Sequence, residues 1–510
     1  MGLSEEINTG ADTVRPSDAV ADAPLAFRLV HWFMLLLVKL FFREIEVVGL
    51  ENVPADRGGV VVSWHPNGLI DPGLIITALP RRIIFGARHG LFKWPVLATL
   101  MRRVGTVPVK VGEGPKADER RRSNMASMNT LAAQVAQGRL TALFPEGISH
   151  DASRPMELKT GAARLYYQAR AQQAEGAAPP VIIPVGLHYD QKGIFRSRAL
   201  VRFHPPMEVA PELDVVPSHD ESETVARDRA RALTSEIGRV LHDVVLATED
   251  WRTHRLISRA RTLMRAESAA RHGRDPGPIR FSDMAEGFAR IRAGYLARRQ
   301  TDPEAVKTLT ERLVRYDEEM VRLGLDDHDL DRSPRLVRPW FSLAAQLLVV
   351  FLLMPPLLVW GYIVNGPAAL ILLALAKAAG KTESDKASIK VLCGAVLFPA
   401  TWVGVGFLAG MGYLELQSQF PHLPDTAVLH GILLGLLSIV GGALALRWLH
   451  LAQETMRSVR VRIVRARRRE VLQRLRAERA EIHRMLMGLR RGLDLRRKRE
   501  PKALGEPAVA

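Results

Sequence analysis

The chain has 510 residues and a formal net charge of +17, and 47% of its residues are hydrophobic. This length exceeds the usual size of one domain, so more than one structural part is expected. Cys393 is the only cysteine, which excludes an intramolecular disulfide and a cysteine-based zinc site. The positive charge is concentrated in residues 454–502, which contain 18 Lys and Arg against 6 Asp and Glu.

The chain opens with two segments of different character. Residues 1–23 are acidic and polar, so we expect a disordered leader without the basic region of a secretory signal peptide. Residues 24–42 form an apolar run interrupted by Arg28, His31 and Lys39. The run is near the length that spans a bilayer, but its charges at both ends favour a helix lying at the membrane interface. A membrane-embedded helix is the alternative.

Residues 43–215 are predicted to form an α/β domain. Short apolar runs bounded by Gly, Pro or charged residues alternate there with helix-like segments such as Gly90–Arg103 and Ser123–Gln137. This alternation favours a largely parallel or mixed sheet. The runs expected as strands are IEVVGL, GVVVSW, RRIIFGA, GTVPVKV, LTALFPEG, VIIPVGLHY and ALVRFHPPMEVA.

The next two regions are predicted to be helical. Residues 216–335 combine Arg, Glu and Ala with apolar residues at helical spacing, which indicates charged, solvated helices without an evident chemical role. Residues 336–452 contain three long apolar stretches and are predicted to be an α-helical transmembrane region. The first stretch contains Pro355-Pro356 and Asn365-Gly366-Pro367, and these breaks predict that it folds back as a hairpin.

Residues 453–510 are predicted to be a basic cytoplasmic helical tail. Residues 454–502 contain no aromatic residue that could stack on a base, so we expect a membrane with anionic lipids as the partner and no nucleic acid. Residues 415–425 contain neither Lys nor Arg, whereas residues 377–390 contain several lysines. The positive-inside rule therefore places 415–425 outside, and the α/β domain and the tail on the cytoplasmic side of the cell membrane.

The first motif with chemical meaning is SWHPNGLIDPG, which contains His65 and Asp71. A neutral imidazole can take a proton from an alcohol near pH 7, and a carboxylate can fix its tautomer and stabilise the imidazolium. An isolated His and Asp in one turn are more often structural, so this pair requires support from a second motif.

This support comes from a second motif, LFPEGISHD at residues 143–151. A strand that ends in Pro-Glu-Gly places amides and a carboxylate at the edge of the sheet where ligands of open α/β sheets bind. Together, HPNGLIDP and FPEGISHD resemble the motifs of the glycerophosphate acyltransferase superfamily. The five residues between His65 and Asp71, and Ser149-His150-Asp151 after FPEG, resemble the branch of glycerol-3-phosphate and dihydroxyacetone-phosphate acyltransferases and their bacterial relatives.

This resemblance implies an acyltransferase-type catalytic domain and a role for each matching residue. His65 would be the base that deprotonates the acceptor hydroxyl, and Asp71 would orient His65. The hydroxyl oxygen would then attack an acyl thioester, so acyl-CoA or acyl carrier protein is the expected co-substrate, and no metal or other cofactor is expected. The substrate-binding residues implied by the motifs are Gly105, Lys110, Glu146, Gly147, Ser149, Lys159 and Pro184.

The chain departs from the family pattern at the phosphate site. Gly105-Thr106-Val107-Pro108-Val109 resembles the family segment that helps to hold the glycerol phosphate. Many members end this segment with an arginine that contacts phosphate, but Val111 stands here. A phosphate dianion still requires cationic partners. The candidate cations are Lys110, Arg102, Arg103, Arg154 and Lys159.

The function expected from the sequence is acyl transfer to a hydroxyl of glycerol-3-phosphate or a related glycerophosphate, in phospholipid biosynthesis. Transfer to an already acylated glycerol phosphate, lysophosphatidic acid, is the alternative within the enzyme class. A non-catalytic membrane protein that binds lipid is an alternative from another class, although the intact His65 and Asp71 argue against it. An arginine-rich nucleic-acid-binding protein is disfavoured by the neighbouring apolar run.

Overall fold

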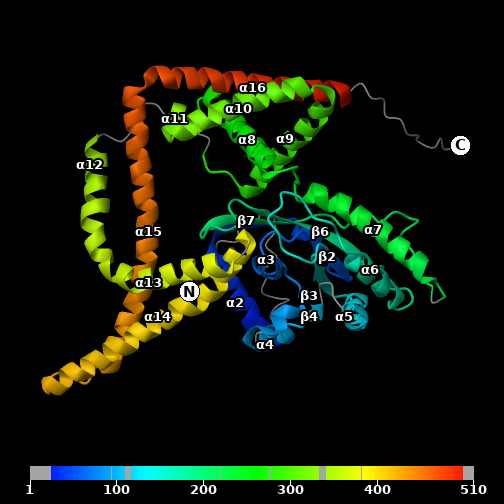
Figure 1. Cartoon of the computed structure of the whole chain (residues 1–510), viewed down its shortest axis with the longest axis horizontal. Helices are drawn as coiled ribbons and strands as arrows, with labels where there is room; N and C mark the ends of the chain where they lie inside the picture. The colour runs from blue at the N-terminus through cyan, green and yellow to red at the C-terminus, as the bar shows by residue number, and fades with distance from the viewer. Residues whose placement is uncertain are drawn as a thin grey trace. The chain divides into compact units, whose positions relative to one another are not determined.

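The structure is a computed structural model that describes residues 24–93, 95–109, 117–218, 220–274, 277–331, 340–380 and 382–497. The chain divides into two compact units, which we describe separately (Figure 1). Unit 1 comprises Met1–Trp251, Arg280–Ser282 and Ala374–Cys393, and unit 2 comprises Arg252–Ile279, Asp283–Leu373 and Gly394–Ala510.

A seven-stranded mixed sheet forms the centre of unit 1, which confirms the predicted α/β fold (Figure 1). The strand order is β1-β7-β6-β2-β5-β3-β4. Strands β2 to β6 run parallel to one another, whereas β7 is antiparallel to β6 and parallel to β1. The bounds are β1 (Phe42–Val48), β2 (Gly59–Ser63), β3 (Ile83–Arg88), β4 (Val107–Val109), β5 (Leu140–Leu143), β6 (Val181–Tyr189) and β7 (Ser197–Phe203), and each strand overlaps a predicted run.

Helices pack on both faces of this sheet. Because successive strand residues point to opposite faces, Val61 packs in one core and Val60 and Val62 pack in the other. The Val61 core contains side chains of α2 (Leu25–Phe41) and α3 (Ile70–Ala78). The opposite core contains side chains of α5 (Ala117–Ala136), α6 (Gly161–Ala171) and α7 (Glu223–Val244). The smaller elements of the domain are η1 (Leu50–Asn52), η2 (His89–Lys93) and α4 (Pro95–Arg103).

Helix α2 has two apolar faces. Phe27, Val38 and Phe41 are buried within unit 1. A second stripe at helical spacing is exposed and consists of Leu25, Leu29, Trp32, Leu36 and Leu40. An exposed apolar stripe of this kind fits insertion into the surface of a bilayer.

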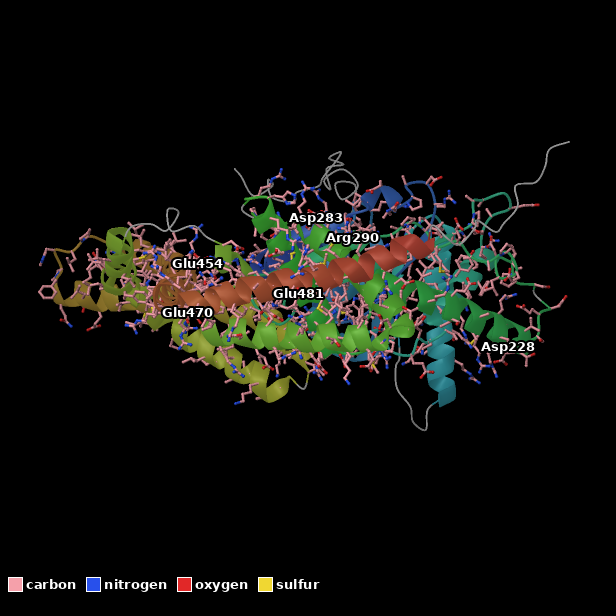
Figure 2. All side chains as sticks on the ribbon, turned by 90° about the horizontal axis from the view of Figure 1, so that it is seen from above. Asp228, Asp283, Arg290, Glu454, Glu470 and Glu481 are labelled. Carbon is pink, nitrogen blue, oxygen red and sulfur yellow. The ribbon has the colours of Figure 1, made fainter. Side chains whose placement is uncertain are left out.

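Unit 2 contains a bundle of charged helices. Its core joins side chains of α8 (Trp251–Arg271), α10 (Pro303–Leu323), α11 (Asp327–Asp331), the end of α15 (Ala427–Arg467) and α16 (Arg469–Arg497), while α9 (Phe281–Thr301) packs beside it. Arg479 on α16 is only 2% exposed, and it forms ion pairs with Glu267 and Asp331. Figure 2 shows Glu470 and Glu481 along α16. Part of the predicted basic tail is therefore a packed helix, and α15 continues without a break through the boundary predicted at residue 452.

Three described helices are long and apolar enough to cross a membrane, namely Leu358–Ala379, Asp385–Gln419 and Ala427–Arg467. They belong to α13 (Met354–Ala379), α14 (Glu383–Gln419) and α15, and α13 follows α12 (Trp340–Leu348) and a π-helical turn at Val349–Leu353. The break predicted at Asn365-Gly366-Pro367 is wrong, because α13 continues through Pro367. Pro355-Pro356 lies instead in the first turn of α13, directly after the π-helical turn.

The apolar helices of unit 2 share polar contacts around Asn365. Its amide Nδ2 donates to the carbonyl oxygen of Ser438 on α15, and its Oδ1 accepts from Trp402 Nε1 on α14. Nearby, a Cβ atom on Gly361 would lie 2.4 Å from the carbonyl oxygen of Gly441, so two helix backbones meet there closely. Small residues and interhelical hydrogen bonds of this kind are typical of helix packing in membranes.

Candidate active site

The two motif loops leave the same edge of the sheet. Strands β2 and β5 are parallel neighbours, with Val62 paired to Leu143, so their carboxyl ends lie together. His65 follows β2, which ends at Ser63, and Glu146 follows β5, which ends at Leu143. Ligands of α/β sheets bind at this edge. The two motifs therefore meet where the sequence predicted.

His65 and Asp71 form a direct pair. Their Nδ1 and Oδ2 atoms are 2.8 Å apart, and the carboxylate of Asp71, in the first turn of α3, is fully buried. The imidazole also stacks on the Phe144 ring, with the ring centroids 4.1 Å apart. A carboxylate can only accept here, so Nδ1 of His65 carries the proton and the lone pair remains on Nε2. This is the tautomer that a general base for an alcohol requires.

Two further groups hold Asp71. The backbone N–H of Asn67 donates to Oδ2 over 2.7 Å, and the hydroxyl of Tyr189 donates to Oδ1. Burial first, and then the adjacent Asp71 charge, raise the pKa of Tyr189 well above its usual value, so the hydroxyl remains a donor. Sequence reasoning missed Tyr189. The available signal was its position at the end of β6, the strand that pairs with β2.

Glu146 is buried and joins three parts of the site. Its Oε2 accepts from the backbone N–H of His65, and its Oε1 accepts from the backbone N–H of Met156. His150 completes the set, with Nε2 2.8 Å from Oε1. Because Nδ1 of His150 accepts from the N–H of Ala152, Nε2 carries the proton and donates to Glu146. These contacts indicate that Glu146 shapes the loop around His65.

The ammonium group of Lys159 lies beside the Pro-Glu-Gly turn. Gly147 adopts φ +72°, which glycine accepts without strain, and its N–H donates to the Phe144 carbonyl. A Cβ atom on Gly147 would lie 3.1 Å from Lys159 Nζ. Ser149 is half-buried in the same loop, next to His150, whose N–H donates to the His65 carbonyl. Gly147, Ser149 and Lys159 are thus gathered near His65.

Lys192 connects the two motif loops and was not predicted. Its Nζ donates to the carbonyl oxygen of Pro66 over 3.0 Å and to that of His150 over 3.4 Å. The same atom is 2.6 Å from Asp151 Oδ1. An ammonium group has three donors, and these three acceptors occupy them. Lys192 therefore positions the loops and is not a phosphate ligand.

Several predicted residues lie away from this cluster. Gly105 precedes β4, at the amino end of the strand and beside Arg82, so it lies at the opposite edge of the sheet from His65. Arg102 and Arg103 end the helix before it. Pro184 is buried within β6 and pairs with Val62, inside the sheet. Lys110 and Val111 lie outside the described residues.

One group of possible metal ligands occurs in the described part of the chain. Asp326, His328 and Asp329 in unit 2 each offer one ligand atom, and these atoms lie within 4.8 Å of one another. Arg457 forms ion pairs with both Asp326 and Asp329. A guanidinium therefore already neutralises this cluster.

Comparisons with known proteins concern the domain that carries these loops. Residues 44–188 match the family model described as Acyltransferase. Glycerol-3-phosphate O-acyltransferase 1 of Saccharomyces cerevisiae is 26% identical over 290 residues, covering 56% of this chain and 35% of that protein. The 1-acyl-sn-glycerol-3-phosphate acyltransferase of Bacillus subtilis is 24% identical over 127 residues, covering 25% of this chain and 58% of that protein.

A solved structure is also similar in part. The crystal structure of the 1-acyl-sn-glycerophosphate acyltransferase PlsC from Thermotoga maritima is 20% identical, with a TM-score of 0.28 over 42% of this chain and 79% of that chain. The matches to the yeast and Bacillus relatives described above cover less than two thirds of the length of those proteins.

The sheet, its motif loops and the family match define an acyltransferase domain at residues 44–188. This domain is homologous to the glycerol-3-phosphate O-acyltransferases, and it has bacterial relatives that acylate lysolipids. The predicted family resemblance and the predicted enzyme class are confirmed.

Proposed function

We propose that the chain is a membrane-bound O-acyltransferase that transfers a fatty acyl group from an acyl thioester to a hydroxyl of glycerol-3-phosphate in phospholipid biosynthesis. The observation that carries the proposal is the buried Asp71 that orients His65 at the carboxyl edge of the sheet, within a domain matched to acyltransferases. The homologous yeast protein is named for this acceptor.

In this proposal, Nε2 of His65 takes the proton of the acceptor hydroxyl while the hydroxyl oxygen attacks the thioester carbonyl carbon. The buried carboxylate of Asp71 stabilises the imidazolium that forms. When the carbon–sulfur bond breaks, the imidazolium returns its proton to the leaving thiolate. The products are an ester and a free thiol, and His65 is restored. Neither a metal nor a further cofactor enters these steps, and the thiol belongs to coenzyme A or acyl carrier protein.

Lys159 is the proposed cation for the acceptor phosphate. Its ammonium group lies beside Gly147, and Gly147 is adjacent to the glutamate that binds the His65 backbone. A phosphate held there would be close enough to His65 to present a neighbouring hydroxyl to it. Arg154 is exposed in the same loop and is the second candidate. Gly147 and Ser149 are proposed to contact the acceptor, whereas Pro184 remains a candidate for the donor side.

A second possible acceptor is indicated by the name of one relative. The Bacillus relative is named for acylation of 1-acyl-glycerol-3-phosphate, so lysophosphatidic acid is the alternative acceptor. Both acceptors carry a phosphate and a free hydroxyl, so they differ mainly in the acyl chain that the site must admit.

The proposed location is the cytoplasmic membrane, with the acyltransferase domain on the cytoplasmic side. The first turns of α14 belong to unit 1 together with the acyltransferase domain, which supports placing residues 377–390 on the same side as the domain. If α14 and α15 each cross the bilayer, residues 415–425 are outside and the basic helix is inside, near anionic headgroups. A cysteine introduced at Ser418 would then react with an impermeant thiol reagent only from the outer side, and labelling only from the cytoplasmic side would contradict this topology.

The decisive test of function uses membranes that contain the full-length protein. Labelled acyl-CoA and acyl carrier protein are offered with glycerol-3-phosphate, dihydroxyacetone phosphate and lysophosphatidic acid in parallel. The proposal expects glycerol-3-phosphate to have the highest kcat/KM. Lys159→Met should raise the KM for the phosphate acceptor about tenfold or more, by loss of a charge-assisted contact, whereas Lys307→Met, an exposed lysine on α10, should not. Transfer to lysophosphatidic acid alone would replace the proposal with the alternative, and transfer to no acceptor would refute both.

A further inference from the structure

The turn that leads into α3 lacks a capping side chain of its own. Leu69 occupies the N-cap position, and its side chain makes no capping hydrogen bond. The first N–H groups of a helix have no partner inside it, and a leucine cannot supply one. This turn matters because Asp71, the partner of His65, lies in the first turn of α3.

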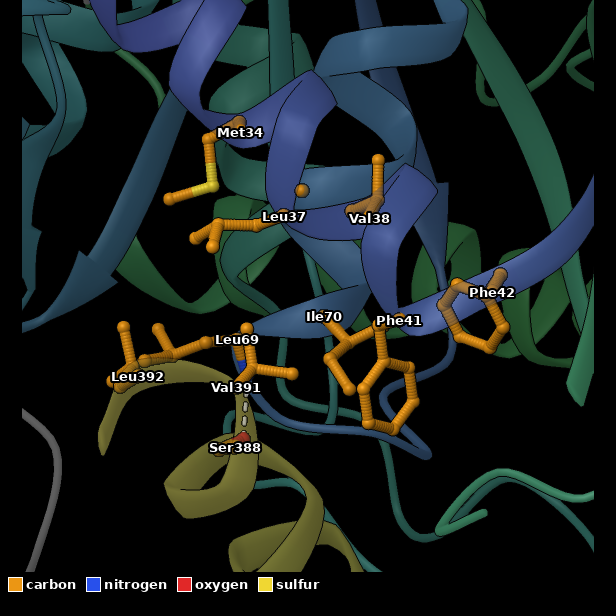
Figure 3. A pocket seen from close by; sticks show the side chains of 11 residues that line it. Met34, Leu37, Val38, Phe41, Phe42, Leu69, Ile70, Ser388, Val391 and Leu392 are labelled. Carbon is orange, nitrogen blue, oxygen red and sulfur yellow. Dashed lines mark hydrogen bonds between the residues drawn. The ribbon is translucent and has the colours of Figure 1, made fainter. Parts of the chain in front are cut away.

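The missing acceptor comes from the beginning of α14. Ser388 Oγ accepts the N–H of Leu69 over 3.2 Å, although the two residues are 319 positions apart in the chain (Figure 3). The preceding residue, Ala387, is fully buried in the core formed with α2 and α3. Val391 and Ile70 both line a small apolar pocket between α14, α3 and α2 (Figure 3). The contact is therefore fixed by packing on both sides.

The same stretch of α14 holds a second loop of the site. Lys390 Nζ donates to the carbonyl oxygen of Gly193 over 3.1 Å. Gly193 follows Lys192, whose ammonium group binds the Pro66 and His150 carbonyl oxygens. Ser388 and Lys390 thus support the two segments that position His65, one through α3 and one through the Lys192 loop. All of these residues belong to unit 1.

We propose that the amino-terminal turns of α14 complete the catalytic centre, with Ser388 and Lys390 as positioning residues for the His65–Asp71 pair. Neither side chain touches substrate in this proposal. Ser388 fixes the turn that carries Asp71, and Lys390 fixes the loop that carries Lys192. The inference rests on the proposed acyl transfer. It adds that the first turns of a helix that is long and apolar enough to cross a membrane help to set the rate of the chemical step.

The test is Ser388→Ala in the full-length protein, assayed in membranes with acyl-CoA and glycerol-3-phosphate. Loss of the cap should lower kcat three- to tenfold while the KM values of both substrates change by less than twofold. Ser388→Thr keeps the acceptor oxygen and should restore kcat. Ser418→Ala, at an exposed position near the other end of the same helix, is the matched control and should retain full activity.

Lys390→Met provides a second variant that does not disturb Leu69. It should lower kcat at unchanged KM, whereas Lys377→Met, an exposed lysine on α13, should leave kcat unchanged. The inference is overturned if kcat of both variants equals that of the wild type. It is also overturned if kcat falls only in parallel with the melting temperature and Ser388→Thr restores neither. A wild-type protein that transfers no acyl group would instead refute the proposed function on which the inference rests.

Discussion

Replacement of Tyr189 by phenylalanine tests the environment of the catalytic carboxylate. The substitution removes one hydroxyl and preserves the shape of a half-buried ring that packs against the core, so little repacking is expected. Asp71 would retain the donors from His65 and Asn67 but lose the one on Oδ1. The variant therefore isolates a single hydrogen bond to a carboxylate that water does not reach.

The size of the effect follows from the chemistry of this bond. A hydrogen bond to a charged group contributes about 1.5–3 kcal/mol, and an unsatisfied buried acceptor adds a similar penalty. Because two donors remain, we expect a value near the lower end, about 1.5 kcal/mol, which corresponds to roughly a tenfold loss in kcat/KM. With less of its charge neutralised, Asp71 should also attract the imidazolium more strongly, so the acidic limb of the pH–rate profile should move to higher pH.

The assay is kcat/KM for acyl transfer between pH 5 and 9, measured for Tyr189→Phe, wild type and Tyr295→Phe. Tyr295 lies on α9 in unit 2 and serves as the matched control. The expected result is a slower variant with a displaced acidic limb, and a control that behaves like the wild type. Unchanged activity and an unchanged profile in Tyr189→Phe would refute the assigned hydrogen bond as a part of the mechanism.

Further substitutions test other contacts. Lys192→Met removes three donor contacts from the motif loops and should lower both kcat, by about tenfold or more, and the melting temperature; normal values of both would contradict its role. Burial lowers the pKa of His204 to about 4, so the unfolded chain binds a proton between pH 6.5 and 4 that the folded chain does not. The free energy of unfolding should therefore fall as pH drops through this window. The melting temperature of His204→Gln should fall less between pH 7 and pH 5 than that of the wild type. Asn365→Leu should destabilise the protein in detergent by about 1 kcal/mol, measured by thermal unfolding, because it breaks two interhelical hydrogen bonds.

The sheet and the central pair could be predicted from sequence because both depend on local patterns. Apolar runs bounded by turn residues mark each strand, and His65 and Asp71 lie close in the chain within one motif. Tyr189 and Lys192 could not be predicted, because their contacts arise only when β6 and the following loop lie beside β2. Strand direction explains Gly105: a residue that precedes a parallel strand lies at the edge opposite to the ligand site.

Two differences between the sequence predictions and the structure concern the apolar helices. Asn365-Gly366-Pro367 predicts a break by the rules for soluble helices, but the side chain of Asn365 is satisfied by Ser438 and Trp402 of neighbouring helices, and the helix continues. The segment 377–390 was noted in the sequence only for its lysines, which indicated a cytoplasmic position. In the structure α14 begins at Glu383, and its first turns pack against the acyltransferase domain, a tertiary contact that composition does not reveal.

His65 is the proposed base for acyl transfer to a glycerophosphate. The most direct measurement compares His65→Ala with wild type and with His272→Ala, an exposed histidine on α8 in unit 2, at matched protein levels in membranes. Release of free thiol and formation of the acylated glycerophosphate are followed together. Both products should fall by at least about a hundredfold in His65→Ala, as expected for loss of a general base, and remain at the wild-type level in His272→Ala. Acyl transfer by His65→Ala within a few-fold of the wild type would contradict this role of His65.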